Sequence, residues 1–314
     1  PRDWNDFKRN YQATFTAQLL YPQIADYEVM PWPARIYEGL YPVSPGSSEK
    51  VRIQEDFASM MQVMINALQK MPLAERTTPG ISVLMANSMM FQAFPSHSGY
   101  DDPQFSNFFG LAMPMLKRGT PVGITHIENL GYEKAIEGVD VLLMSYSNMK
   151  PLDKEAHQHL ADWVRCGGHI IYSATDEDPF QSVQEWWNTG EYSFKAPSDH
   201  LFALMGVEAA SAEGVYSYGK GSLTILRKDP KEYVYAGECE KPLIDAIESI
   251  IGPMNISNAL VLERGPYRIV AVMDEGETED SYVAEGCLID LYDSNLPVYS
   301  RKEVRPGNQA LFFD

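Results

Sequence analysis

The sequence predicts an α/β protein built from three successive parts. These are the end of a (β/α) barrel in residues 1–78, a doubly wound domain in 79–258, and a small β-sandwich in 259–314. Three observations support this division. Helical stripes of apolar residues dominate the first part, apolar strands alternate with helices in the second, and alternating strand patterns with turn residues fill the third.

The first part has the order helix, strand, loop, helix. Residues 4–21 and 49–71 each place aromatic and aliphatic side chains on one helical face. Between them, residues 27–36 (YEVMPWPARI) alternate like an edge strand, because their prolines would remove hydrogen bonds from a central one. This order is the ending of a barrel, so we expect the chain to be a fragment or a processed product.

The second part carries the strand pattern of a parallel sheet that is covered on both faces. Its strands are apolar almost throughout, as such sheets require, and they are predicted at 81–87, 121–127, 139–146 and 169–174. The intervening helices are predicted at 103–118, around Glu133, and at 151–168. Ligands of doubly wound sheets bind beyond the carboxyl ends of the strands, so the site is expected in those loops.

Composition excludes several partners. The formal net charge of −18 opposes binding to nucleic acid and to anionic membrane surfaces. No apolar run reaches the roughly 18–20 residues of a membrane span, so no membrane partner is expected. No targeting segment is recognisable at the amino terminus, which leaves the compartment open, with the cytoplasm favoured.

The sequence lacks the motifs of a cofactor site and of an amidotransferase nucleophile. The loop after the first strand of the doubly wound domain has no G-x-G-x-x-G, and GKGS (219–222) lies in a predicted hairpin rather than a strand-turn-helix. A class I glutamine amidotransferase, which has a similar strand order, needs a cysteine on a strand-to-helix elbow, and Cys166, Cys239 and Cys287 occupy none. We therefore predict a flavodoxin-like or amidotransferase-like scaffold without its nucleophile and without a cofactor. The cysteines are expected to be buried free thiols.

The two histidines of the helix predicted at 151–168 do not indicate a metal site. His157 and His159 are two residues apart, so they face different directions on a helix. We expect both to be solvated, and we predict no metal site.

The first candidate binding residues lie on the predicted edge strand. Alternation points Glu28 and Trp32 to one side of it, and Arg35 follows three residues later. An indole can stack on a sugar ring, and a carboxylate can accept hydrogen bonds from its hydroxyls. Glu28, Trp32 and Arg35 are therefore predicted to bind substrate, with a structural ion pair between Glu28 and Arg35 as the alternative.

Further candidates lie in the loops of the doubly wound domain. His97 follows the first strand, and Asp176 and Glu177, next to Asp178, follow the last one, where ligands bind in such folds. Trp186 belongs to a tryptophan pair in polar surroundings. The alternatives are loop ordering by His97, helix capping by the acids, and core packing by one tryptophan.

Three motifs together resemble a known enzyme family. In order, YEVMPWPARI, VDVLLMSYSNMKPLDKEAHQHLADWVRCGGHIIYSA and GVYSYGKGSLTIL resemble the eighth barrel strand, the trimerisation-type domain and a late hairpin of glycoside hydrolase family 42 β-galactosidases. The resemblance covers nearly the whole chain as an order of modules. Trp32 matches the family's eighth-strand tryptophan and Arg35 loosely matches a nearby arginine, whereas Glu28 replaces the usual aromatic residue.

The resemblance implies the carboxyl-terminal portion of a retaining, β-galactosidase-like hydrolase that acts on carbohydrate and forms a homo-oligomer, a dimer or a trimer. Such enzymes use glutamates after the fourth and seventh barrel strands, and neither position is present in this sequence. The catalytic residues are thus unknown, Glu28 is the candidate within the chain, and this portion alone is not expected to be catalytically complete. Two alternatives stay open: a noncatalytic carbohydrate-binding or oligomerisation module, and an unrelated hydrolase that uses Asp176, Glu177, Asp178 and His97.

Overall fold

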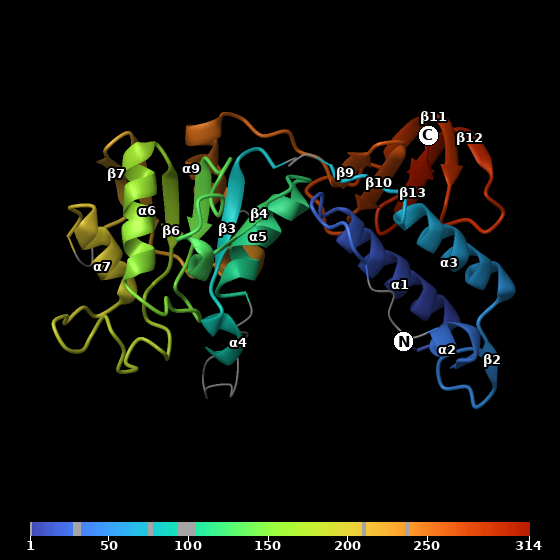
Figure 1. The fold of residues 1–314 in the computed structure, drawn as a ribbon, viewed down its shortest axis with the longest axis horizontal. Helices are drawn as coiled ribbons and strands as arrows, with labels where there is room; N and C mark the ends of the chain where they lie inside the picture. Colours follow the sequence, from blue (N-terminus) through green and yellow to red (C-terminus); the bar gives the residue numbers. More distant parts are fainter. Residues whose placement is uncertain (1, 28–32, 75–77, 93–104, 209–211, 236–238) are drawn as a thin grey trace. The chain divides into compact units, whose positions relative to one another are not determined.

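The chain folds into two compact units rather than the three parts that the sequence predicts. Residues 1–77, 117–119 and 256–314 form unit 1, and residues 78–116 and 120–255 form unit 2. The computed structural model (Figure 1) describes residues 2–27, 33–74, 78–92, 105–208, 212–235 and 239–314. Unit 2 begins at residue 78, and the first and third predicted parts share one core, so they belong together in unit 1.

Unit 1 is built on a five-stranded antiparallel sheet covered by two long helices, and it also holds a small two-stranded hairpin. The sheet has five strands in the order β12-β11-β13-β10-β9, so the expected sandwich of two sheets is one sheet with helices on one face. Its elements are α1 (Trp4–Leu19), α2 (Pro33–Tyr37), β1 (Leu40–Pro42), β2 (Lys50–Arg52), α3 (Glu55–Leu68), β9 (Ala259–Arg264), β10 (Tyr267–Val272), β11 (Tyr282–Asp290), β12 (Val298–Val304) and β13 (Gln309–Phe313).

The core of unit 1 explains this arrangement. The apolar stripes predicted at 4–21 and 49–71 form α1 and α3, and both face the same side of the sheet. Met60, Met61 and Met64 of α3 are buried in one cluster with Leu262 and Ile269 of the sheet. Burial of such side chains stabilises a fold by about 1.5–3 kcal/mol each. The helices therefore gain their stability from the carboxyl-terminal sheet.

The expectation of a barrel strand at 27–36 is wrong over residues 33–36, which belong to the short helix α2 together with Arg35. Residues 28–32, and with them Glu28 and Trp32, lie outside the described residues. After α2, β1 pairs with β2 in a small hairpin.

Unit 2 has the predicted mixed α/β architecture. Its sheet has the order β4-β3-β5-β6-β8-β7, and every neighbouring pair is parallel except β7 with β8. Its elements are β3 (Ile81–Met85), α4 (Ser88–Gln92), α5 (Phe108–Lys117), β4 (Gly123–His126), a 3-10 turn (Ile127–Asn129), β5 (Val141–Met144), α6 (Glu155–Cys166), β6 (His169–Ser173), α7 (Pro197–Leu204), β7 (Gly214–Tyr218), β8 (Gly221–Leu226), α8 (Glu232–Tyr235) and α9 (Lys241–Ile251).

Helices cover both faces of this sheet, which is why its central strands β3 and β5 are mostly apolar (Figure 1). One face packs against α6 and α7 through residues such as Leu142 and Ile170. The other face packs against α5 and α9 through residues such as Val141 and Ile171. Consecutive residues of one strand thus pack into the two cores on opposite faces of the sheet. The four strands predicted from apolar runs are confirmed.

Two sequence-based expectations for local structure can be compared with the fold. The helix expected around Glu133 is a series of turns. GKGS forms the turn of the β7–β8 hairpin, as predicted, and a Cβ at Gly219 or Gly221 would clash with backbone oxygens at the end of α6. Its glycines therefore serve close packing and not a phosphate.

The expectation of buried cysteines is wrong. Cys166 and Cys287 are exposed and Cys239 is half-buried, because Cys166 lies on the solvent side of α6 and Cys287 on an exposed stretch of β11. Among the described helices, none is long and apolar enough to cross a membrane.

Candidate functional site

The carboxyl ends of β3 and β5 meet at the point where the strand order of unit 2 reverses. The chain runs from β3 to β4 on one side and returns to β5 on the other. A hydroxyl joins the two loops there: Ser88 Oγ donates to the carbonyl of Lys150 at 2.6 Å and accepts from its N–H at 2.7 Å. Crevices at such reversals are the usual ligand sites of open α/β sheets.

Lys150, one of the two residues at this junction, also forms a buried ion pair. Lys150 Nζ donates to Asp178 Oδ2 at 2.6 Å and to the carbonyl of Tyr146 at 2.5 Å, and both charged side chains are almost fully buried. Burial lowers the pKa of Lys150, and the Asp178 carboxylate opposes that shift. The pair therefore links the loop after β5 to the loop after β6, and it offers no group to a ligand.

The three acidic residues at 176–178 have different roles in the structure. Asp176 adopts a left-handed conformation with φ of 58° and accepts hydrogen bonds from the Tyr172 hydroxyl, from Ser198 Oγ at 2.9 Å and from Arg227 Nη1 at 2.7 Å. Asp178 pairs with lysine, and Glu177 is exposed. Asp176 and Asp178 thus hold the loop together, and of the three only Glu177 presents its side chain to solvent.

Sequence reasoning missed a buried histidine pair. His157 is fully buried, so the expectation that it is solvated is wrong, whereas His159 is exposed as expected. His157 Nε2 lies 2.7 Å from the Tyr146 hydroxyl, and its Nδ1 lies 2.9 Å from Nδ1 of His200 in α7. Burial lowers the pKa of both histidines, and each pKa is lowered further by a neighbouring cation or imidazole.

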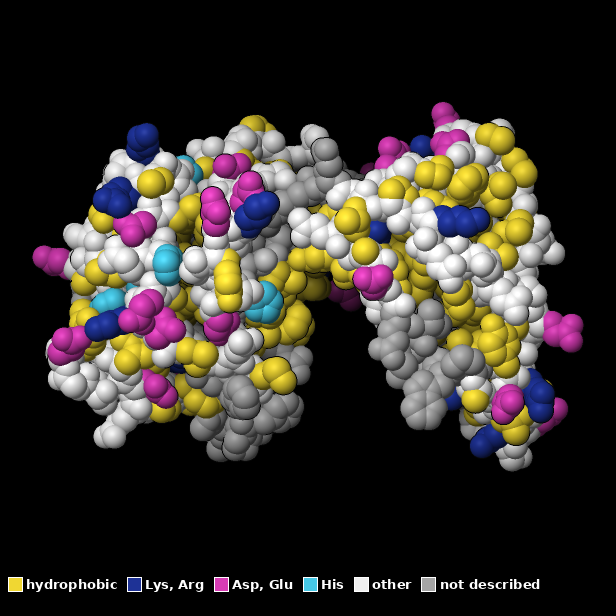
Figure 2. Space-filling view, in the orientation of Figure 1, with side chains coloured by type: hydrophobic (Ala, Val, Ile, Leu, Met, Phe, Trp, Pro, Cys, Tyr) yellow, Lys and Arg dark blue, Asp and Glu magenta, His cyan; other side chains and the backbone are white. Residues whose placement is uncertain are grey.

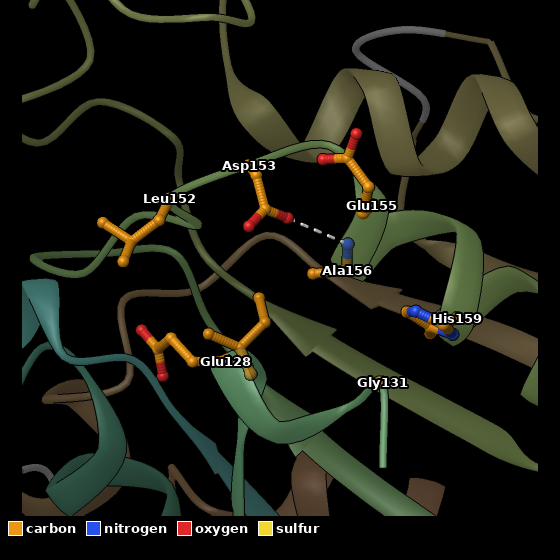
Figure 3. A pocket seen from close by; sticks show the side chains of 8 residues that line it. Glu128, Gly131, Leu152, Asp153, Glu155, Ala156 and His159 are labelled. Carbon is orange, nitrogen blue, oxygen red and sulfur yellow. Dashed lines mark hydrogen bonds between the residues drawn. The ribbon is translucent and has the colours of Figure 1, made fainter. Parts of the chain in front are cut away.

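The pocket shown in Figure 3 opens beside the start of α6. We call it the Glu128 pocket; its volume is about 180 Å³ and it is lined by Ile127, Glu128, Gly131, Leu152, Asp153, Glu155, Ala156 and His159. Figure 3 shows Glu128 on one side of the pocket and Asp153 and Glu155 on the other, with the Glu155 carboxylate turned away from Glu128. Glu128 Oε1 accepts from the N–H of Asn87 at 2.7 Å, while its Oε2 is buried without a hydrogen bond to any described residue. Glu128 thus borders the pocket with a carboxylate whose Oε1 is engaged and whose Oε2 is buried.

A second hollow adjoins this pocket. We call it the Trp186 hollow; its volume is about 360 Å³ and it is lined by Leu152, Asp153, Lys154, Glu155, Trp186, Thr189, Gly190, Glu191 and Tyr192. The two cavities share Leu152, Asp153 and Glu155. Figure 2 shows acidic, basic and histidine side chains interspersed with apolar ones on the face of unit 2 that carries α6.

Aromatic rings form one wall of the Trp186 hollow. The Trp186 ring meets those of His157, His200 and Tyr192 edge to face at centroid distances of 5.4, 5.1 and 6.2 Å. Its indole N–H donates to the carbonyl of Pro151 at 3.0 Å. Neighbouring Trp187 is buried, so one tryptophan of the pair packs in the core and the other borders the hollow.

The predicted site residues do not form one cluster in the described part of the chain. His97, like Glu28 and Trp32, lies outside the described residues. Arg35 is exposed and belongs to unit 1, whereas Asp176, Glu177 and Trp186 belong to unit 2. Within the described ranges, no group of three or more histidine, cysteine, aspartate or glutamate side chains is arranged to hold a metal ion.

The chain matches no protein-family description and no curated protein. Among solved structures it is similar to a glycoside hydrolase family 42 β-galactosidase from G. stearothermophilus, with 11% identity, a TM-score of 0.48, and coverage of 81% of this chain and 42% of that one. It is also similar to the β-galactosidase of Bacillus circulans sp. alkalophilus, with 10% identity, a TM-score of 0.45, and coverage of 81% and 43%. The corresponding values for the enzyme from the psychrophilic Marinomonas ef1 are 10%, 0.43, 82% and 41%. The chain spans less than half the length of these proteins.

Proposed function

We propose that this chain is a portion of a glycoside hydrolase-related protein and that unit 2 binds carbohydrate. The binding site is formed by the adjoining Glu128 pocket and Trp186 hollow, which together are called the groove. The observation that supports this proposal is the pairing of an aromatic wall, Trp186 and Tyr192, with carboxylates across the same groove. Sugars present apolar ring faces and hydroxyl donors, which these two kinds of side chain accommodate. The two volumes lie near or below the ~300–1,000 Å³ of ordinary ligand pockets, which favours a short saccharide.

The charge of the groove narrows the class of sugar. Glu128, Asp153 and Glu155 line it, and the cation Lys154 is already held by Glu191 Oε1 at 2.9 Å. An anionic sugar, such as a uronate or a sugar phosphate, would face repulsion from this surface. The proposed ligand is therefore a neutral saccharide or one that carries an amino group.

Two carboxylates of the groove are engaged in hydrogen bonds to the protein backbone, which argues against a role in hydrolysis. Glu128 Oε1 holds the backbone of Asn87, and Asp153 Oδ1 accepts from the N–H of Ala156 at 3.2 Å in the first turn of α6. Retaining hydrolysis needs a nucleophile and an acid about 5–5.5 Å apart, on either side of one glycosidic bond. We assign the groove a binding role only. The expected homo-oligomer stays a prediction.

The purified 314-residue chain should not hydrolyse aryl β-galactosides at an enzymatic rate. The release of nitrophenol from a nitrophenyl β-galactoside should equal that of a heat-inactivated sample at the same concentration. Turnover that disappears in Glu128→Gln or Glu155→Gln would contradict the binding role and assign hydrolysis to the groove.

Trp186→Leu should weaken saccharide binding by about 1–3 kcal/mol, the range measured for aromatic stacking on other flat ligands. Isothermal titration calorimetry with a panel of neutral oligosaccharides measures this change. The matched control is Trp163→Leu, because Trp163 lies on α6 and packs on Gly168, outside both cavities. Failure of the unmodified chain to bind any neutral or amino saccharide at millimolar concentration refutes the proposal, as does equal loss in both variants.

A further inference from the structure

The aromatic wall of the groove rests on the histidine pair. Residues 180–195, here called the wall segment, carry Trp186 and Tyr192 and connect the loop after β6 to α7. The rings of Trp186 and Tyr192 both lie 5.1 Å from that of His200, and Phe194 lies 5.6 Å from it. The position of the wall is thus fixed by contacts with the imidazoles of α6 and α7.

The geometry of the pair allows one proton between the two rings. The Nδ1 atoms of His157 and His200 are 2.9 Å apart, so one must donate and the other accept. The Tyr146 hydroxyl at Nε2 of His157 continues this chain of hydrogen bonds. If both Nδ1 atoms carried protons, two donors would face each other and the contact would break.

The surrounding charges do not favour protonation. From the start of α6, Lys154 acts on His200 and adds a positive charge. From α7, Asp199 Oδ2 accepts from the N–H of Ala196 at 3.2 Å, and from the loop after β6, Asp176 is held by Arg227.

The remaining titratable neighbours are tyrosines and one glutamate. Burial raises the pKa of Tyr146, which follows β5, and of Tyr172 on β6, so both hydroxyls are neutral in acid. Tyr192 faces His200 from the wall segment, and Glu191 beside it is bound to Lys154. Of the described carboxylates near the pair, Asp176 and Glu191 are each bound to a cation, and Asp199 accepts a backbone N–H.

The wall segment also buries polar atoms that have no hydrogen-bond partner among the described residues. The indole N–H of Trp187 and both polar atoms of the Gln181 side chain are buried without a hydrogen bond to any described residue. Each such group costs about 1–3 kcal/mol when it leaves water. Opening of the segment would return these atoms to solvent, which lowers the cost of release.

We propose that the His157–His200 pair is an acid-sensitive latch: protonation of both rings places a proton on each Nδ1 atom, breaks their contact, releases the wall segment and dismantles the aromatic wall of the Trp186 hollow. A histidine with a lowered pKa in the folded state stabilises the closed form fully above the ordinary value of about 6.5 and progressively less below it. Loss of saccharide binding in acid would follow from the function proposed above. The latch itself is independent of any ligand.

Hydrogen exchange read by mass spectrometry tests the latch directly, without a saccharide. Between pH 7.5 and 5.0, protection factors of peptides from residues 180–195 should fall at least tenfold, while peptides from β5 and β6 keep theirs. His200→Gln, which cannot gain a charge, should remove the pH dependence. His126→Gln is the control, since His126 lies at the end of β4 and lines neither cavity, and it should behave like the unmodified chain.

A pH-independent protection factor in the unmodified chain would overturn the latch, as would an unchanged fall in His200→Gln. A fall shared by all of unit 2 would show global acid unfolding and would also overturn it. If His200→Gln does not fold, the midpoint of histidine titration followed by nuclear magnetic resonance decides the question. Titration of the two buried rings must then coincide with the loss of protection, and a separate midpoint refutes the latch.

Discussion

Replacing Arg264 with methionine should lower the free energy of unfolding of unit 1 by about 3–5 kcal/mol. The guanidinium of Arg264 is fully buried at the end of β9. Its Nε donates to the carbonyl of Pro72 at 2.8 Å, its Nη2 donates to that of Ile24 at 2.8 Å, and its Nη1 donates to the Tyr27 hydroxyl. Methionine fills similar space but leaves these acceptors buried and unpaired.

The measurement is a urea series with pulsed hydrogen exchange, read on peptides from β10. Arg264→Lys should restore little of the loss, because one ammonium group cannot reproduce a planar fork of donors. Arg301→Met serves as the control, since Arg301 is exposed on β12 and pairs with exposed Glu285. A change below 1 kcal/mol in Arg264→Met, equal to the control, would show that the buried guanidinium does not hold unit 1 together.

In unit 2, Asp178→Ala should cost about 3–5 kcal/mol, because it leaves the Lys150 ammonium buried without its counter-charge. The pKa of Lys150 is already lowered by burial, and loss of the carboxylate should lower it further. Between that pKa and the ordinary value near 10.4, the unfolded state binds more protons than the folded state. The stability of the variant relative to the unmodified chain should therefore rise from pH 7 to pH 9.

Urea denaturation at both pH values, followed by exchange of β6 peptides, measures this effect. The double variant Lys150→Met, Asp178→Leu should recover most of the lost stability, since two apolar groups of similar size need no partner. Lys241→Ala, which removes an exposed pair with Asp245, should change stability by less than about 1 kcal/mol. A double variant as unstable as Asp178→Ala would mean that the cost comes from packing and not from the stranded charge.

The central strands of unit 2 could be predicted because they are short runs that are mostly apolar. The run at 141–144 needs no knowledge of its neighbours to be recognised as a strand covered on both faces. The grouping of the first and third predicted parts into one unit could not be predicted, because no local pattern shows that Met61 will meet Leu262. Only pairing over some 200 residues of sequence decides that contact.

The candidate site was predictable in location and less so in its residues. The carboxyl ends of the strands were the expected place, and Trp186 does border a cavity there. His157 could have been found, because it shares the buried helical stripe of Leu160, Ala161 and Val164, whereas His159 does not. Arg264 likewise alternates with buried Leu262 on β9. The buried Lys150 has no such signal, since its partner Asp178 is contributed by another loop.

The division of the chain between the two units has a consequence for biosynthesis. Unit 2 is almost continuous in sequence, whereas unit 1 is completed by residues 256–314. Ribosomes add about 5–20 residues per second, so α1 and α3 emerge roughly 10–40 s before the sheet that covers their apolar faces. Unit 2 can fold during that interval, while the nascent amino-terminal helices wait with Met60 and Met61 accessible to chaperones. Translation speed and chaperone supply should therefore influence the yield of unit 1 more than that of unit 2.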